Sequence, residues 1–211
     1  MSNRLFILPV VAASPDALIG LAWATGAAHR FEDSIAWARK ALAIDADLPA
    51  AYGILGDADV ELGRYEDAEK NYQRMLDLRP DMGSYSRAAQ LLYLQGNAMR
   101  AMSLMRQAIR AGGSNPEHTA WCVAALARML CREGVAPSAL QLVETSLRQA
   151  PDNVLLLAAA GHARMACGDD AGAIAAYERA IARLGAPFGN KRRVLSSHSD
   201  DKFNPVLRRF L

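Results

Sequence analysis

Two arginines have the residue type and the spacing for specific molecular recognition. Arg128 and Arg132 are four positions apart in a stretch with helical apolar spacing, so both side chains lie on one face of the expected helix. A guanidinium is a planar donor that binds a carboxylate through two parallel hydrogen bonds. The spacing therefore allows capture of an acidic group. The alternative is a solvated helix face without a ligand.

Residues suited to catalysis or metal binding form no motif. The sequence has no HExxH, no glycine-rich phosphate loop and no cysteine pair at zinc-ligand spacing. Cys122 and Cys131 are about 13 Å apart along one expected helix, too far for a disulfide. The histidines are far apart in sequence: His29, His118, His162 and His198. We expect a protein that is not an enzyme and that has no cofactor and no metal site.

The stretch from Pro49 to Pro80 shows which elements hold such residues. Its apolar residues recur at helical spacing on two segments separated by Gly63, which predicts two antiparallel amphipathic helices. Gly56 and Ala68 are small, and we expect the two helices to cross at these positions because a bulky side chain there would separate them. An alanine-rich composition with little Val or Ile also favours helices.

This unit recurs along the chain. Counted from Pro49, its pattern resembles the tetratricopeptide repeat (TPR) of bacterial type at Tyr52, Leu55, Gly56, Gly63, Tyr65, Ala68, Tyr72 and Pro80. Similar spacing predicts about five copies, at residues 15–48, 49–81, 82–115, 116–152 and 153–185. The resemblance implies an all-α fold: an α-solenoid of antiparallel helix pairs in a right-handed superhelix, closed by a short C-terminal capping helix.

Stacked helix pairs of this kind leave a concave groove lined mainly by the first helix of each pair. Positions on those helices that face away from the packing are the candidates for contact with a partner. The expected groove residues are Trp23, Asp57, Glu61, Gln90, Tyr93, Arg128, Arg132 and His162.

One step between copies is four residues longer than the others, over residues 111–117. Asn115 is placed to cap a new helix that begins at Pro116. The insertion is either a longer loop on the convex rim or a joint that divides the array.

The two ends of the sequence differ from the repeats. Residues 1–13 are an N-terminal arm or, alternatively, a short secretory signal, so we expect a cytoplasmic protein or, in the second case, an exported one. Residues 186–211 form a basic tail that ends in a short amphipathic pattern. That pattern either caps the array or occupies a groove.

These features favour a non-catalytic adaptor or scaffold that binds a peptide or helix of a partner protein in the groove. The alternative is a self-associating structural subunit of a larger assembly, hence a homo-oligomer. The lysine and asparagine clamp of TPR domains that hold chaperone C-termini is replaced by Ile19 and Trp23. A net charge of +2 makes nucleic acid an unlikely partner, and no stretch reaches the ~20 apolar residues of a membrane span.

Overall fold

The computed structural model describes residues 14–185. The expected N-terminal arm or signal at residues 1–13 lies outside the described residues, as do the basic tail and its capping helix at residues 186–211. Within residues 14–185 every regular element is an α-helix.

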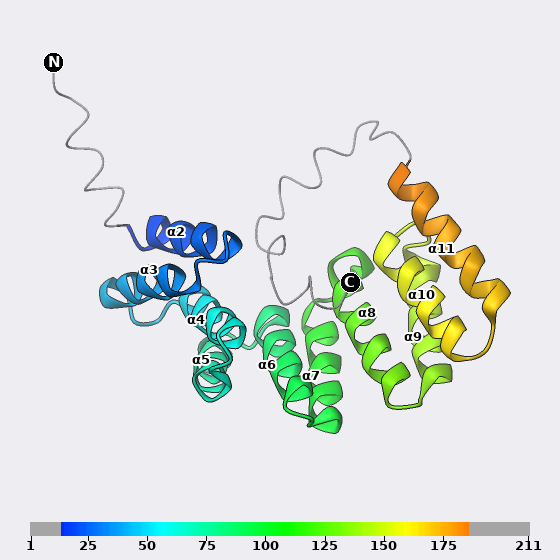
Figure 1. The fold of residues 1–211 in the computed structure, drawn as a ribbon, viewed down its shortest axis with the longest axis horizontal. Coiled ribbons are helices and arrows are strands. Elements are labelled where there is room, and N and C mark those ends of the chain that lie inside the picture. The colour runs from blue at the N-terminus through cyan, green and yellow to red at the C-terminus, as the bar shows by residue number, and fades with distance from the viewer. Residues whose placement is uncertain (1–13, 186–211) are drawn as a thin grey trace, which may run out of the picture. The chain divides into compact units, whose positions relative to one another are not determined.

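The chain divides into two compact units between Pro80 and Asp81. The described helices of the first unit are α2 (Pro15–Ala27), α3 (Phe31–Ile44), α4 (Pro49–Glu61) and α5 (Tyr65–Leu78). Those of the second are α6 (Met82–Leu94), α7 (Ala98–Ala111), α8 (Pro116–Arg132), α9 (Ala136–Gln149), α10 (Val154–Ala166) and α11 (Asp170–Gly185). Figure 1 shows that successive helices of a pair run antiparallel.

The longer link after α7 does not separate the chain, because α7 packs on α8. This link is tightly packed at Gly112, where a Cβ would lie 2.5 Å from Cγ2 of the buried Thr119 and 2.9 Å from Sδ of Met82. Asn115 accepts a hydrogen bond of 3.0 Å from the backbone N–H of Glu117, so it caps α8 as expected. The joint proposed at residues 111–117 is therefore not the point of division, which lies at Pro80.

The turn inside each helix pair has the same backbone geometry. Gly63 has a φ of +75°, and Gly96, Gly134 and Gly168 have similar values, which glycine adopts without steric cost. The following residue then bonds back into the helix, as where the N–H of Arg64 donates to the carbonyl oxygen of Asp59 at 2.8 Å. In the first pair His29 takes this position with a φ of +58°. This is the degenerate copy of the repeat.

Helix crossing is set by a glycine and an aromatic ring. A Cβ at Gly56 would collide with the ring of Tyr72, and a Cβ at Gly161 would lie 2.7 Å from the ring of Tyr177. The expected crossing at Gly56 is thus explained by a tyrosine of the second helix that packs over the missing side chain. Tyr65, in contrast, begins α5 and is exposed.

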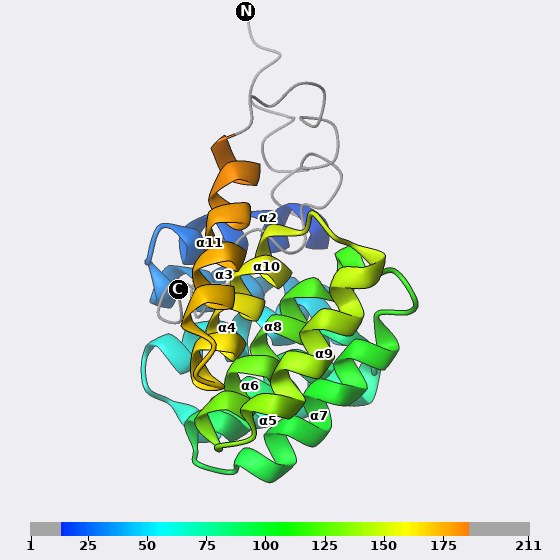
Figure 2. The same ribbon diagram turned by 90° about the vertical axis from the view of Figure 1, so that its right-hand side faces the viewer.

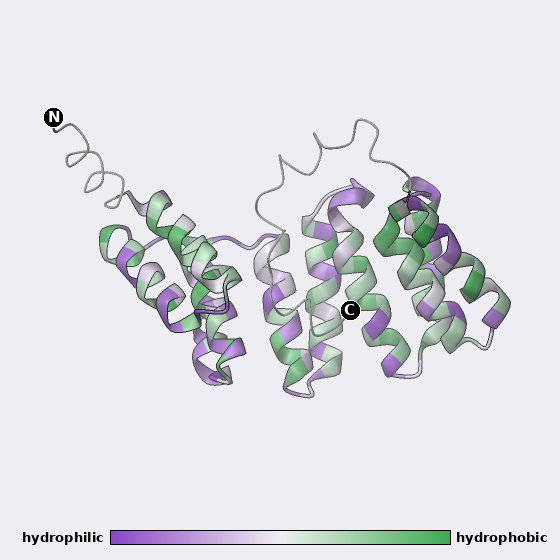
Figure 3. Cartoon of the chain, turned by 45° about the horizontal axis from the view of Figure 1, so that its top comes forward, coloured by the Kyte–Doolittle hydropathy of each residue, from purple (hydrophilic) through white to green (hydrophobic). Residues whose placement is uncertain are grey.

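Each unit has its own apolar core. In the first, residues of α2, α3 and α4 pack together around Ile35, Ile54 and Leu55. In the second, α6 to α11 contribute to a larger cluster that includes Met105, Leu126 and Leu156. In Figure 3 apolar residues, in green, alternate with hydrophilic residues, in purple, along the helices. The predicted all-α architecture of antiparallel helix pairs is confirmed.

Candidate partner-binding face

Three of the expected groove residues belong to the first unit. Trp23 of α2 is half-buried and packs against the core of that unit. Asp57 of α4 accepts a 2.8 Å hydrogen bond from the hydroxyl of Tyr72, and Glu61 is half-buried at the end of the same helix. Asp57 therefore has a structural contact with the tyrosine that packs on Gly56.

The second unit brings Tyr93, Arg128 and Arg132 together. Tyr93, near the end of α6, donates a hydrogen bond to Oε1 of Glu133 over 3.4 Å and also bonds with the guanidinium of Arg132. Burial raises the pKa of the Tyr93 hydroxyl, and the Glu133 carboxylate raises it further, while Arg132 opposes both. The C-terminal ends of α6 and α8 are joined by this cluster.

Arg128 lies one turn before Arg132 on α8 and is half-buried. Burial lowers the pKa of the Arg128 guanidinium, and the positive charge of Arg132 lowers it further. Two like charges of this kind repel each other, so an anion placed between them would be stabilised.

Gln90 precedes Tyr93 by three positions, so the two share one face of α6. Its Nε2 is buried and has no hydrogen-bond partner among the described residues, and the same holds for Nε1 of Trp121 on α8. We call the surface formed by Gln90, Tyr93, Arg128 and Arg132 the arginine face.

His162 of α10 is exposed, and its Nδ1 lies 3.0 Å from the carbonyl oxygen of Ala158. Its ring contacts the ring of Tyr177 edge to face, with 5.5 Å between centroids. His162 and Asp57 occupy the same position in two repeats, next to the crossing glycine, and each contacts the tyrosine of its own pair. The sequence pattern gave no sign of this second role.

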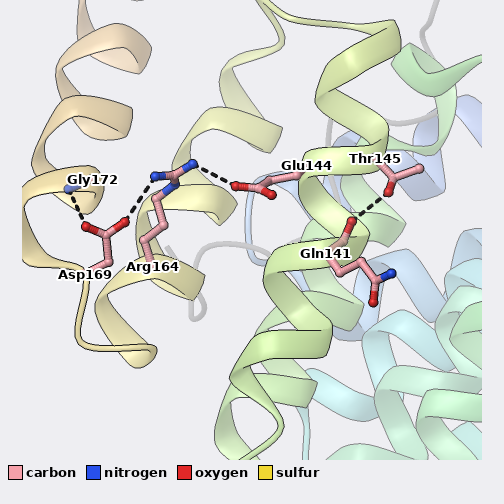
Figure 4. A network of polar contacts seen from close by, with 6 residues as sticks. All are labelled: Gln141, Glu144, Thr145, Arg164, Asp169 and Gly172. Atoms are coloured by element: carbon pink, nitrogen blue, oxygen red, sulfur yellow. Dashed lines mark hydrogen bonds and ion pairs between the residues drawn. The ribbon is translucent and has the colours of Figure 1, made fainter.

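A polar network joins α9, α10 and α11 (Figure 4). Arg164 pairs with Glu144 at 2.7 Å and with Asp169 at 3.1 Å. Asp169 in turn accepts the backbone N–H of Gly172 at 2.9 Å, so it starts α11 as an acid at a helix N-terminus should. This network is structural and lies apart from the arginine face in sequence.

The sequence alone allowed a comparison of Cys122 with Cys131 along one helix. The structure also brings Cys131 near Cys167, which follows another helix. α8 packs on α10, and the Cys131 thiol has its pKa raised by burial and by the nearby Cys167 thiol. Cys131 directly precedes Arg132. Separation along one helix could not reveal a neighbour in the next repeat.

Two further features of the described residues bear on function. Within residues 14–185, no group of three or more His, Cys, Asp or Glu side chains is arranged to hold a metal ion. In the same range, no helix combines the length and apolar character that crossing a membrane requires.

Comparison with known proteins supports the repeat assignment. Residues 55–116 match the sequence profile of the tetratricopeptide repeat. A comparison with curated protein sequences finds no significant match.

Several solved structures share the fold at low sequence identity. PilF of Pseudomonas aeruginosa is 17% identical with a TM-score of 0.70, covering 80% of this chain and 76% of that one. PilW, a type IV pilus biogenesis factor, is 13% identical with a TM-score of 0.69, covering 81% and 77%. YrrB, a TPR protein with an unusual peptide-binding site, is 18% identical with a TM-score of 0.55, covering 86% and 89%.

At these identities the likeness concerns the fold. Together with the profile matched over residues 55–116, the helix pairs and the glycine at four of the inner turns, it shows an array of about five tetratricopeptide-type repeats.

Proposed function

We propose that the protein is a non-catalytic adaptor whose arginine face binds an acidic peptide or helix of a partner protein. The observation that carries this proposal is that Arg128 and Arg132, two like charges, lie one turn apart on the same face of α8. Arg128 is half-buried there. TPR-type repeats are in general scaffolds for protein–protein interaction, although a fold alone does not fix a function.

The surroundings of the two arginines suit a peptide with both an acidic and an apolar side. Tyr93 is an aromatic contact that is fixed by Glu133 and Arg132, and Leu94 next to it is exposed. Aromatic and arginine side chains are the residues that most often dominate the free energy of an interface. The peptide-binding site of YrrB shows that a protein of similar fold has been used for peptide recognition.

The test is charge reversal. Arg128→Glu with Arg132→Glu should weaken retention of a partner by tenfold or more, because truncating or reversing a partly buried interfacial charge costs roughly 2 kcal/mol or more. Immobilised wild-type and variant chains would be compared for binding of amphipathic acidic peptides and of proteins from the native host. Arg132→Glu alone, at an exposed position, separates a binding defect from a folding defect.

Helix α7 offers a matched control. Arg106 and Arg110 are also four positions apart and are exposed on the second helix of a pair. Arg106→Glu with Arg110→Glu makes the same change in net charge away from the arginine face. Equal losses of binding in the two double variants would show that only net charge matters, and unchanged binding in the Arg128 and Arg132 variant would refute the proposal.

A further inference from the structure

The outer side of α11 carries an apolar stripe that no described helix covers. Ile174 is 59% exposed, Ile181 67% and Leu184 60%. These three residues stand at positions i, i+7 and i+10 of the helix. That is the spacing of a helix face that packs on another helix.

This stripe is distinct from the face by which α11 joins its unit. Ala173, Ala176 and Ala180 are buried and pack toward α10, the neighbour of α11 (Figure 2). Ile174, Ile181 and Leu184 therefore face away from the core, whereas the ring of Tyr177 packs on Gly161 of α10. Burial of three such aliphatic side chains would stabilise a packed segment by several kcal/mol, so an uncovered stripe is costly to the chain.

An acidic side chain borders the stripe. Glu178 is exposed and lies between Ile174 and Ile181 on the helix surface. Within residues 14–185 it has no ion-pair or hydrogen-bond partner, whereas Arg183 of the same helix pairs with Asp152 at 2.5 Å. A segment that binds this stripe would therefore be apolar on one side and carry a basic residue beside that side.

We propose that residues 204–211 of the same chain cover this stripe. Their sequence, NPVLRRFL, places Val206, Leu207, Phe210 and Leu211 on one side of a short helix and Arg208 and Arg209 on its two flanks. An arginine on either flank can reach Glu178 when the apolar sides meet. The segment has the complementary chemistry in both respects.

The connecting chain is long enough for this contact. α11 has 16 residues and is therefore about 24 Å long, whereas the chain between Gly185 and Asn204 spans up to roughly 60 Å when extended. A tether of this kind gives an effective concentration on the order of millimolar. Even a weak intrinsic affinity then covers the stripe most of the time.

Residues 204–211 contain two arginines and no acid, so they are not a ligand for the arginine face. The two proposals therefore fail independently. A segment bound on α11 leaves Arg128 and Arg132 available to a partner.

The experiment uses the full chain and a chain that ends at residue 189. Removal of the tail should speed hydrogen exchange in the amides of α11 several-fold, and a synthetic peptide of residues 203–211 should restore protection in the shortened chain. The same peptide should bind the full chain at least tenfold more weakly, because the stripe is already covered. Ile181→Glu should abolish peptide binding, and Glu178→Arg should weaken it by about three- to tenfold.

Control variants and light scattering distinguish residues 204–211 from a second copy of the chain as the segment that covers the stripe. Met99→Glu alters an exposed apolar residue of α7 and should leave peptide binding unchanged. Equal exchange of α11 in both chains, with no binding of the peptide, would overturn the proposal. So would protection of α11 that depends on protein concentration and accompanies a dimer in light scattering, because the occupant would then be a second copy.

Discussion

At the scale of single residues, the crossing of each helix pair depends on a complementary choice of two side chains. Gly56 faces Tyr72 and Gly161 faces Tyr177, whereas in the third repeat the equivalent positions hold Ala89 and Met105, both fully buried. A ring on the second helix requires that the first helix lacks a Cβ. A methionine leaves room for a methyl group.

This complementarity predicts that the effect of Gly56→Ala on stability changes sign with the residue at position 72. Gly56→Ala should destabilise the protein by about 1–3 kcal/mol because the new methyl group collides with the Tyr72 ring. In the Tyr72→Met background the same change should stabilise by up to about 1 kcal/mol, the helix propensity of alanine over glycine. Gly20→Ala in α2, where nothing lies within 4 Å, is the control and should also stabilise. Thermal melts of the wild type, the two single variants at positions 56 and 72 and the double variant would measure the coupling energy between the two positions. Additive effects of the two substitutions would contradict the prediction.

Asp59 leads to a prediction about pH. Its side chain is only 6% exposed and accepts a 2.9 Å hydrogen bond from Asn71. Burial raises its pKa above the ordinary value, an effect that the Asn71 bond opposes; Asp67 raises the pKa further, and Arg64 and Arg39 lower it. The folded state thus binds this proton more tightly than the unfolded state, and stability from this group falls as pH rises from 3.8 through the raised pKa.

Asp59→Asn should therefore raise the melting temperature at pH 7, since it removes a buried charge and keeps an acceptor for Asn71. The gain should shrink as pH falls below the raised pKa, where Asp59 is neutral as well. Melts of both proteins between pH 3.5 and pH 8 would show this trend. Glu69→Gln, at an exposed position of α5, should show no such pH-dependent gain, and an equal gain at every pH would argue against titration of Asp59.

At the scale of helices, the sequence predicted the elements well because their ends depend on local chemistry. Proline at the first helical position marks the starts of α4 and α8, and a glycine with positive φ marks four of the inner turns. His29 takes the same backbone conformation without being glycine. Its contact with Phe31, edge to face at 5.6 Å, accompanies a conformation that costs an ordinary residue roughly 1–2 kcal/mol.

The candidate site was predicted less completely, because it depends on contacts between repeats. Helical spacing placed Arg128 and Arg132 on one face, but it could not show that Tyr93 reaches Arg132 and Glu133. It also placed Asp57 on the outward side of its helix but could not show that the hydroxyl of Tyr72 donates a hydrogen bond to it. Periodicity identifies which side of a helix faces outward. It does not identify which outward side chains are engaged by the neighbouring helix.

At the scale of the whole molecule, each unit consists of helix pairs that pack on the next pair of the same unit: α3 packs on α4, α7 packs on α8, and α8 and α9 pack on α10. The division at Pro80 nevertheless does not coincide with the lengthened link after Ala111. Packing at Gly112, Thr119 and Met82 keeps α7 and α8 together despite the extra residues. The number of residues in a link is therefore a poor guide to where a repeat array divides.

The division predicts that the two units differ in stability. The core of the first unit is the smaller one and is centred on Ile35, Ile54 and Leu55, while that of the second contains more buried residues and includes Met105 and Leu126. Because apolar burial grows with domain size, a fragment of residues 81–192 should fold alone and melt at a higher temperature than a fragment of residues 1–80. Circular dichroism melts of both fragments and of the full chain would measure this. If neither fragment were helical while the full chain folded in one transition, the two units would be parts of a single cooperative structure.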